Sequence, residues 1–98
     1  MDTPLTPYTI AQAVCDRLTA HRAAARIVCG PRGEGAMVLL DPLVLVPDPP
    51  AAVRFDRPQG RGNREREWVR LDLGDRMARL PDAAVEILAH HRTAQSPI

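Results

Sequence analysis

The segment Glu65–Leu73 reads EREWVRLDL and alternates between polar and apolar side chains. Three apolar residues share one parity: Val69, Leu71 and Leu73. Three other residues share the opposite parity: Trp68, Arg70 and Asp72. Successive side chains of a β-strand point to opposite faces of a sheet, so this pattern predicts a strand with one face in the core. The other face, with its tryptophan among charged residues, is left to water or to a partner.

Three stretches upstream of this segment also have the composition of strands. Ala36–Leu40 and Leu43–Val46 are apolar and flank Asp41-Pro42. We expect this dipeptide to form a turn, a bulge or a sheet edge, because proline cannot donate a hydrogen bond to a ladder. Ala52–Asp56 alternates and would place Val53 and Phe55 on one face. The residues from Arg57 to Arg64 contain proline and glycine and predict a long hairpin loop.

A helix is predicted before these strands by apolar residues at the spacing i, i+4 and i+8: Ile10, Val14 and Leu18. It begins either at Thr9, with Gln12 completing a capping box, or one turn earlier at Thr6, whose neighbour is a proline. We expect it to end near Ala24. The following segment Arg26–Cys29 either continues the helix or forms a strand.

A second helix is predicted after the strands, with Pro81 at its first position and Arg92 near its end. One side of it carries four residues suited to packing: Ala84, Ile87, Leu88 and His91. Before it, Asp75–Leu80 is expected to form one short helical turn.

The length of 98 residues fits one domain, and the net charge of +1 with 45% hydrophobic residues argues against disorder. The order of elements predicts a single α+β domain over residues 1–98. Its parts are an N-terminal helix, a three- or four-stranded antiparallel sheet and a C-terminal helix. Two helices on one face of the sheet would bury their apolar stripes and leave the other face open. Residues 1–8 are expected to be an extended lead-in and residues 93–98 a loose tail.

The residue types exclude several kinds of catalysis. All thirteen basic residues are arginine, so Schiff-base chemistry and Walker-type phosphate binding have no lysine. The single serine, Ser96, lies in the expected tail. Asp41 precedes Pro42, and Asp72 and Asp75 lie on either side of Gly74, where aspartate is ordinary turn chemistry. We therefore expect a protein that is not an enzyme and holds no cofactor.

Histidine and cysteine offer a candidate soft metal site if His21 and His91 approach Cys15 or Cys29. No close-spaced ligand pair supports that site, so we expect no metal. We also expect both cysteines to be reduced. No apolar run is long enough to span a membrane, and Met1–Tyr8 lacks the regions of a secretory signal. These features predict a cytoplasmic protein without a membrane partner.

Exposed apolar side chains lead to the main functional hypothesis. Leu43–Val46 has no alternation, so both of its faces need cover, and two helices cover one face of a sheet. We expect an adaptor or assembly subunit for protein–protein interaction, which binds a protein partner or a second copy in a homo-oligomer. The expected interface residues are Trp68, Arg70, Leu43 and Leu45.

An Arg-rich loop leads to an alternative hypothesis, that of a nucleic-acid-binding module. Residues 54–70 hold six arginines and three acidic residues. Such a loop can lie along a phosphate backbone while Phe55 or Trp68 stacks on a base, or its arginines can pair with the acids in solvent. The residues expected to bind nucleic acid are Arg57, Arg61, Arg64, Arg66 and Phe55.

Overall fold

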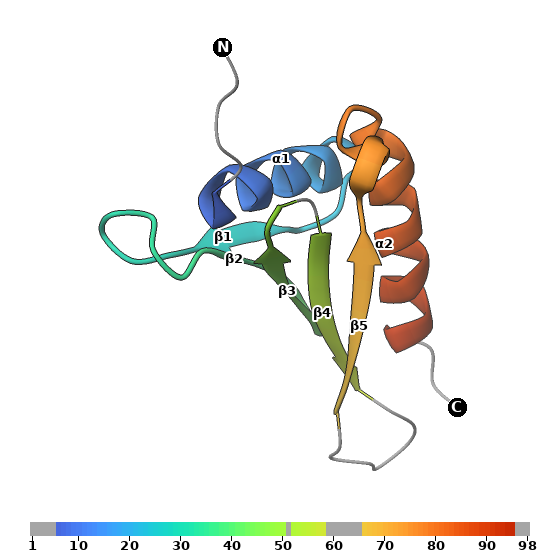
Figure 1. Cartoon of the computed structure of the whole chain (residues 1–98). Coiled ribbons are helices and arrows are strands. Elements are labelled where there is room, and N and C mark those ends of the chain that lie inside the picture. The colour runs from blue at the N-terminus through green and yellow to red at the C-terminus, as the bar shows by residue number, and fades with distance from the viewer. Residues whose placement is uncertain (1–5, 51, 59–65, 96–98) are drawn as a thin grey trace.

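The computed structural model describes residues 6–50, 52–58 and 66–95 of the chain (Figure 1). Along the chain, the first helix is followed by five strands, a short 3-10 helix and a second helix. The elements are α1 (Pro7–Ala20), β1 (Arg26–Val28), β2 (Met37–Leu40), β3 (Leu43–Asp48), β4 (Ala52–Pro58), β5 (Arg66–Asp72), η1 (Gly74–Met77) and α2 (Leu80–Gln95).

The described strands form one antiparallel sheet of five strands in the order β1-β2-β3-β4-β5. The expectation of three or four strands was therefore too low. The additional strand is β1, in which Arg26 pairs with Leu39 and Val28 pairs with Met37. Asp41-Pro42 forms the turn between β2 and β3, which leaves both flanking strands free to pair through Leu40 and Leu43.

The start of α1 is the earlier of the two expected positions. Thr6 is the N-cap, its hydroxyl accepts a hydrogen bond from the Thr9 backbone N–H at 3.2 Å, and Pro7 follows it. The capping box of Thr9 with Gln12 is therefore wrong. Gln12 instead accepts a hydrogen bond from the Tyr8 hydroxyl and donates one to Asp16 at 2.8 Å.

The end of α1 comes at Ala20, four residues before the expected end near Ala24. Arg22 adopts a left-handed conformation with φ of 65°, which turns the chain away from the helix axis. The backbone N–H of Ala23 then donates to the Leu18 carbonyl at 3.0 Å, a bond that closes the helix end. This reversal frees the next residues to form β1.

The second helix begins one residue before Pro81, at Leu80, and continues to Gln95. The tail expected from residue 93 is therefore helical over its first three residues, and the lead-in expected over residues 1–8 already enters α1 at Pro7. The rest of both segments, residues 1–5 and 96–98, lies outside the described residues. The short turn expected after β5 is present as η1, and Leu80 beyond it is buried.

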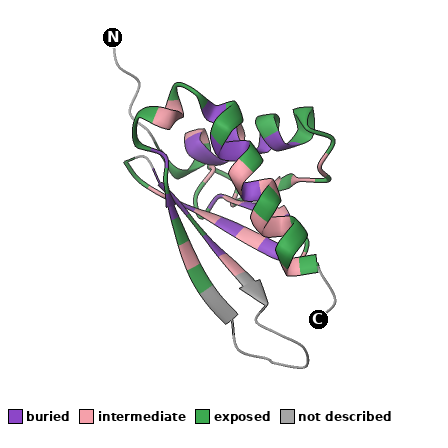
Figure 2. Ribbon diagram, turned by 90° about the vertical axis from the view of Figure 1, so that its right-hand side faces the viewer, coloured by how far each residue is buried: buried purple, intermediate pink, exposed green. Residues whose placement is uncertain are grey.

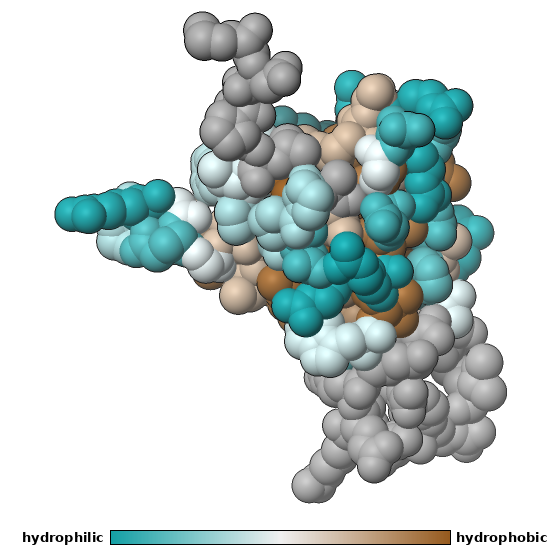
Figure 3. Space-filling view, in the orientation of Figure 1, coloured by the Kyte–Doolittle hydropathy of each residue, from teal (hydrophilic) through white to brown (hydrophobic). Residues whose placement is uncertain are grey.

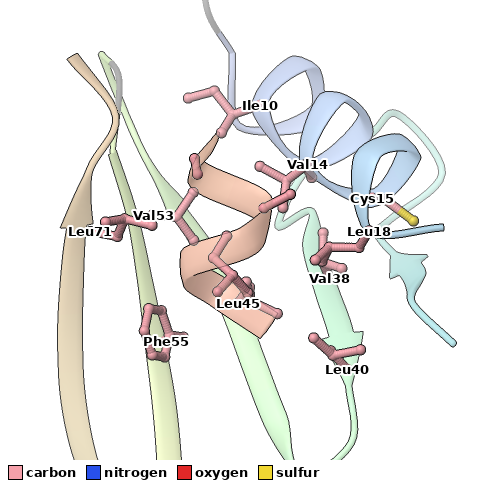
Figure 4. Packing of buried hydrophobic residues seen from close by; sticks show 14 of the residues in the cluster. Ile10, Val14, Cys15, Leu18, Val38, Leu40, Leu45, Val53, Phe55 and Leu71 are labelled. Carbon is pink, nitrogen blue, oxygen red and sulfur yellow. The ribbon is translucent and has the colours of Figure 1, made fainter. Parts of the chain in front are cut away.

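Both helices lie on the same side of the sheet (Figure 2). One hydrophobic cluster joins α1, α2 and the face of the sheet that they cover (Figure 4). Ile10, Val14 and Leu18 of α1 are all buried in it, as the helical spacing predicts. Phe55 of β4 is fully buried there, and its ring lies 5.0 Å from that of His90 of α2. The α+β class and the order helix, antiparallel sheet, helix are thus confirmed.

Candidate functional site

The sheet face that points away from both helices is half apolar, and we call it the open face. Its apolar half lies on β1, β2 and β3 and consists of Val28, Met37, Leu39, Val44 and Val46, with the exposed Arg26 opposite Leu39 on the edge strand β1. Val28 is 43% exposed, and the other four side chains are half-buried. Neither helix covers this half, because the sheet lies between it and them (Figure 2). Burying such a patch against another apolar surface would be favourable.

The other half of the open face lies on β3, β4 and β5 and is charged. Arg54 and Arg70 are direct cross-strand neighbours, a pairing of like charges that would be repulsive alone. Asp48 offsets this repulsion, since its carboxylate accepts a hydrogen bond from Arg70 and lies 3.9 Å from the Nε atom of Arg54. Figure 3 shows hydrophilic and hydrophobic surface side by side over the strands. The open face therefore joins an apolar patch to a preformed charged network.

Trp68 lies on the charged half, as the parity of its strand predicts. Its side chain is 55% exposed. The guanidinium carbon of Arg54 lies 5.5 Å from the centre of its ring, a cation–π distance. The contact restrains the indole without covering it, so its large apolar surface is held in place next to Arg70.

Two of the expected interface residues, Leu43 and Leu45, are placed wrongly by the sequence hypothesis. Both side chains are fully buried in the core, on the face covered by the helices. Their neighbours Val44 and Val46 occupy the open face instead. Every residue of Leu43–Val46 is apolar, so the sequence of β3 does not show which of its faces points inward. The register with β2 and β4 decides this.

The alternative nucleic-acid site loses Phe55, one of its two candidate stacking rings, and keeps the exposed Trp68. Phe55 is fully buried and cannot stack on a base, because its parity on β4 is that of Val53 in the core. The loop expected to start at Arg57 starts later, since β4 runs through Arg57 and ends at Pro58.

The structure describes only part of the set of arginines expected to bind nucleic acid. Arg61 and Arg64 lie outside the described residues. The structure places only the backbones of Arg57 and Arg66, in β4 and β5. The phosphate-binding hypothesis therefore keeps its sequence basis in these arginines and has no stacking ring from Phe55.

The structure brings the two histidines considered for metal binding to one cleft and places both cysteines elsewhere. His21 and His91 line one open cleft together. Cys15 is buried in the core, and Cys29 is exposed at the end of β1. No group of three or more histidine, cysteine or acidic side chains in the described residues is arranged to hold a metal ion.

The aspartates considered for acid–base chemistry lie at turns and at a helix start. The Asp72 carboxylate accepts a hydrogen bond from the backbone N–H of Gly74 at 3.1 Å. Asp41 lies in the turn between β2 and β3, and Asp75 lies in the first turn of η1. Asp72 therefore helps to shape the turn from β5 into η1.

Comparison of the chain with protein-family models, curated proteins and solved structures finds no match. Within the described residues, no helix has the length and apolar character needed to cross a membrane.

Proposed function

We propose that this protein is a non-enzymatic assembly subunit that binds another protein through the open face of its sheet. The main support for the proposal is the apolar patch of β1, β2 and β3, whose side chains lie on the sheet face that points away from the helices. An antiparallel sheet with one solvated face ordinarily alternates between apolar and polar residues. Here Leu39 and Val44 pair across β2 and β3 on the open face, while the residues on either side of them face the core.

The composition of the open face supports a protein partner. Tryptophan and arginine are the residue types most enriched at the centres of protein–protein interfaces. Trp68 and Arg70 stand two residues apart on β5, and Arg54 contacts the Trp68 ring from β4. A ring that is already restrained loses less conformational entropy when a partner covers it.

The thiols suggest where such a subunit acts. Cys15 and Cys29 are both free, the first buried and the second exposed. An exposed free thiol fits a reducing compartment, so we place the proposed activity in the cytoplasm.

A matched pair of valine substitutions tests the proposal. Val28 on the open face is 43% exposed, and Val85 on α2 is 57% exposed. Val28→Asp puts a charge into the apolar patch and should weaken association about tenfold, whereas Val85→Asp should leave association unchanged. Each change should alter the folding free energy by at most about 1 kcal/mol, which thermal melting checks.

Association is read in two ways: from sedimentation of the purified chain, and from the proteins that become cross-linked to it in its own cells. The proposal requires that Val28→Asp lose contacts that Val85→Asp keeps. Equal behaviour of the two variants in both readouts would contradict it.

A further inference from the structure

The strand β5 forms one edge of the sheet, and its outer side is suited to pairing with another strand. It is the last strand in the order, so β4 is its one neighbour among the described strands. An edge strand presents unpaired N–H and C=O groups, which form a template for a further strand. The opposite edge is β1, which has three residues, whereas β5 has seven. The longer edge can form more hydrogen bonds with an added strand.

The open-face residues of β5 are complementary to themselves in the antiparallel direction, while Glu67 meets Leu71 on the other face. It reads REWVRLD from Arg66 to Asp72, with Val69 at its centre. When a second copy of this strand runs antiparallel with Val69 opposite Val69, Arg66 lies opposite Asp72 and Trp68 lies opposite Arg70. Opposite charges and an arginine beside an aromatic ring are favourable cross-strand pairs.

We propose that β5 pairs with β5 of a second copy of this chain, antiparallel and with Val69 opposite Val69 of the partner subunit. In that register Trp68 lies opposite Arg70 of the partner subunit, and Arg66 lies opposite Asp72 of the partner subunit. The two-fold symmetry produces each pair twice. This inference rests on the proposed function, since it names a second copy as one protein that the subunit binds.

Other registers are less favourable. Moving the partner strand by two residues in one direction places Arg70 opposite Arg70 of the partner subunit. Moving it by two residues in the other direction places Arg66 opposite Arg70 of the partner subunit, twice. Like charges directly opposite one another destabilise a strand pair. A shift by one residue would set core-facing side chains against open-face side chains, which the pleat forbids.

The pairing has a structural consequence for the open face. Antiparallel strands in one continuous sheet are related by a two-fold axis perpendicular to it, so two five-stranded sheets become one of ten strands. The open faces of both copies then lie on the same side. The two apolar patches, on β1 to β3 of each copy, then lie on this same side toward the two ends of the joined sheet.

Two substitutions of opposite charge at Trp68 test the register. Trp68→Arg sets a positive charge against Arg70 of the partner subunit, and we expect the dimer dissociation constant to rise about tenfold. Trp68→Glu sets a negative charge against the same arginine, and we expect a dissociation constant within about threefold of that of the unmodified chain. Sedimentation from about 1 µM to about 1 mM spans the range expected for a small interface. Circular dichroism melting checks that both variants are folded.

The outcomes separate this inference from the proposed function. If both Trp68 variants weaken the dimer equally, or neither does, the register is wrong, and the Val28 and Val85 comparison still decides the role of the open face. If the unmodified chain is monomeric at all these concentrations, pairing with a second copy is overturned. Binding of a different protein through the open face then remains to be judged by the cross-linking of the same two valine variants.

A charge exchange at the ends of β5 tests the same register without changing Trp68. Arg66→Asp and Asp72→Arg each create like-charge pairs in a dimer of identical chains, so each alone should weaken association. In a one-to-one mixture the two variants face each other with opposite charges, and association should return toward that of the unmodified chain. A mixture that associates no better than either variant alone would overturn the pairing.

Discussion

Arg22 is the residue at which the chain leaves α1, and its conformation is costly for an arginine. Its φ of 65° lies in the left-handed region, where a side chain with a Cβ atom is strained and glycine is not. Helices commonly place glycine at this position. The reversal at Arg22 directs the chain into β1, and the pairing of β1 with β2 offsets the strain.

We predict that Arg22→Gly stabilises the protein by about 1 kcal/mol, because it removes this strain without removing the hydrogen bond from Ala23 to Leu18. Chemical denaturation measures the change. Arg22→Ala is the matched control, since alanine keeps the Cβ atom and the strain while removing the same charge. Equal effects of the two substitutions would show that the charge of Arg22, and not its backbone, governs stability here.

Two aromatic residues show what residue-level reasoning predicts and where it fails. The parity of β5 correctly places Trp68 on the open face, because charged residues on one side of the strand mark the apolar side as the core. The sequence around Phe55 alternates equally well and predicts the face it shares with Val53. The nucleic-acid hypothesis nevertheless assigned its ring to a binding role, and the full burial of Phe55 against His90 removes that role.

At the scale of elements, α1 depends on its apolar stripe more than on any single polar contact. Leu18 is fully buried between the helix and the sheet, in the same cluster as Val38. We predict that Leu18→Ala costs about 2–5 kcal/mol, because it removes buried contacts and leaves a cavity in a small core.

The matched control is Thr6→Ala at the N-cap of the same helix, which should cost about 1 kcal/mol through loss of the bond to Thr9. Urea denaturation of both variants gives the two free energies. If the cap substitution costs as much as the core substitution, the stripe is not what holds α1 on the sheet.

The sequence predicts the existence of most elements and fails on details set by tertiary contacts. The spacing of Ile10, Val14 and Leu18 predicts α1, and alternation predicts β4 and β5. The short strand β1 is left undecided, because three residues carry no periodicity and only pairing with β2 makes them a strand. The inward residues of β3 are left undecided too, because Leu43–Val46 is apolar at every position.

This same undecided run explains the errors in the candidate site. Leu43 and Leu45 were expected at an interface, and the register assigns them to the core. The residues that do lie on the open face, such as Leu39 and Val44, belong to runs that are apolar on both faces. That property was the available signal. Two helices cover only one face of a sheet, so a strand that is apolar on both faces exposes apolar side chains on the uncovered face.

At the scale of the whole molecule, the fold is an open two-layer structure. Both helices pack on one face of the sheet (Figure 2). The opposite face combines an apolar patch with a charged network and Trp68. The longer of the two sheet edges, β5, is complementary to itself. We propose that face and edge together make the sheet side of the molecule its binding side.

Hydrogen exchange of the backbone amides is a direct test of this proposal. Exchange is measured on the unmodified chain at concentrations where sedimentation shows it to be dissociated and where it shows association. We predict that every second amide of β5 over residues 66–72, whose N–H points away from β4, exchanges more slowly in the associated protein, because it becomes hydrogen-bonded to the partner strand. The amides of α1 and α2 should exchange at the same rate in both conditions. Association that slows exchange in the helices and leaves these β5 amides unchanged would contradict this prediction.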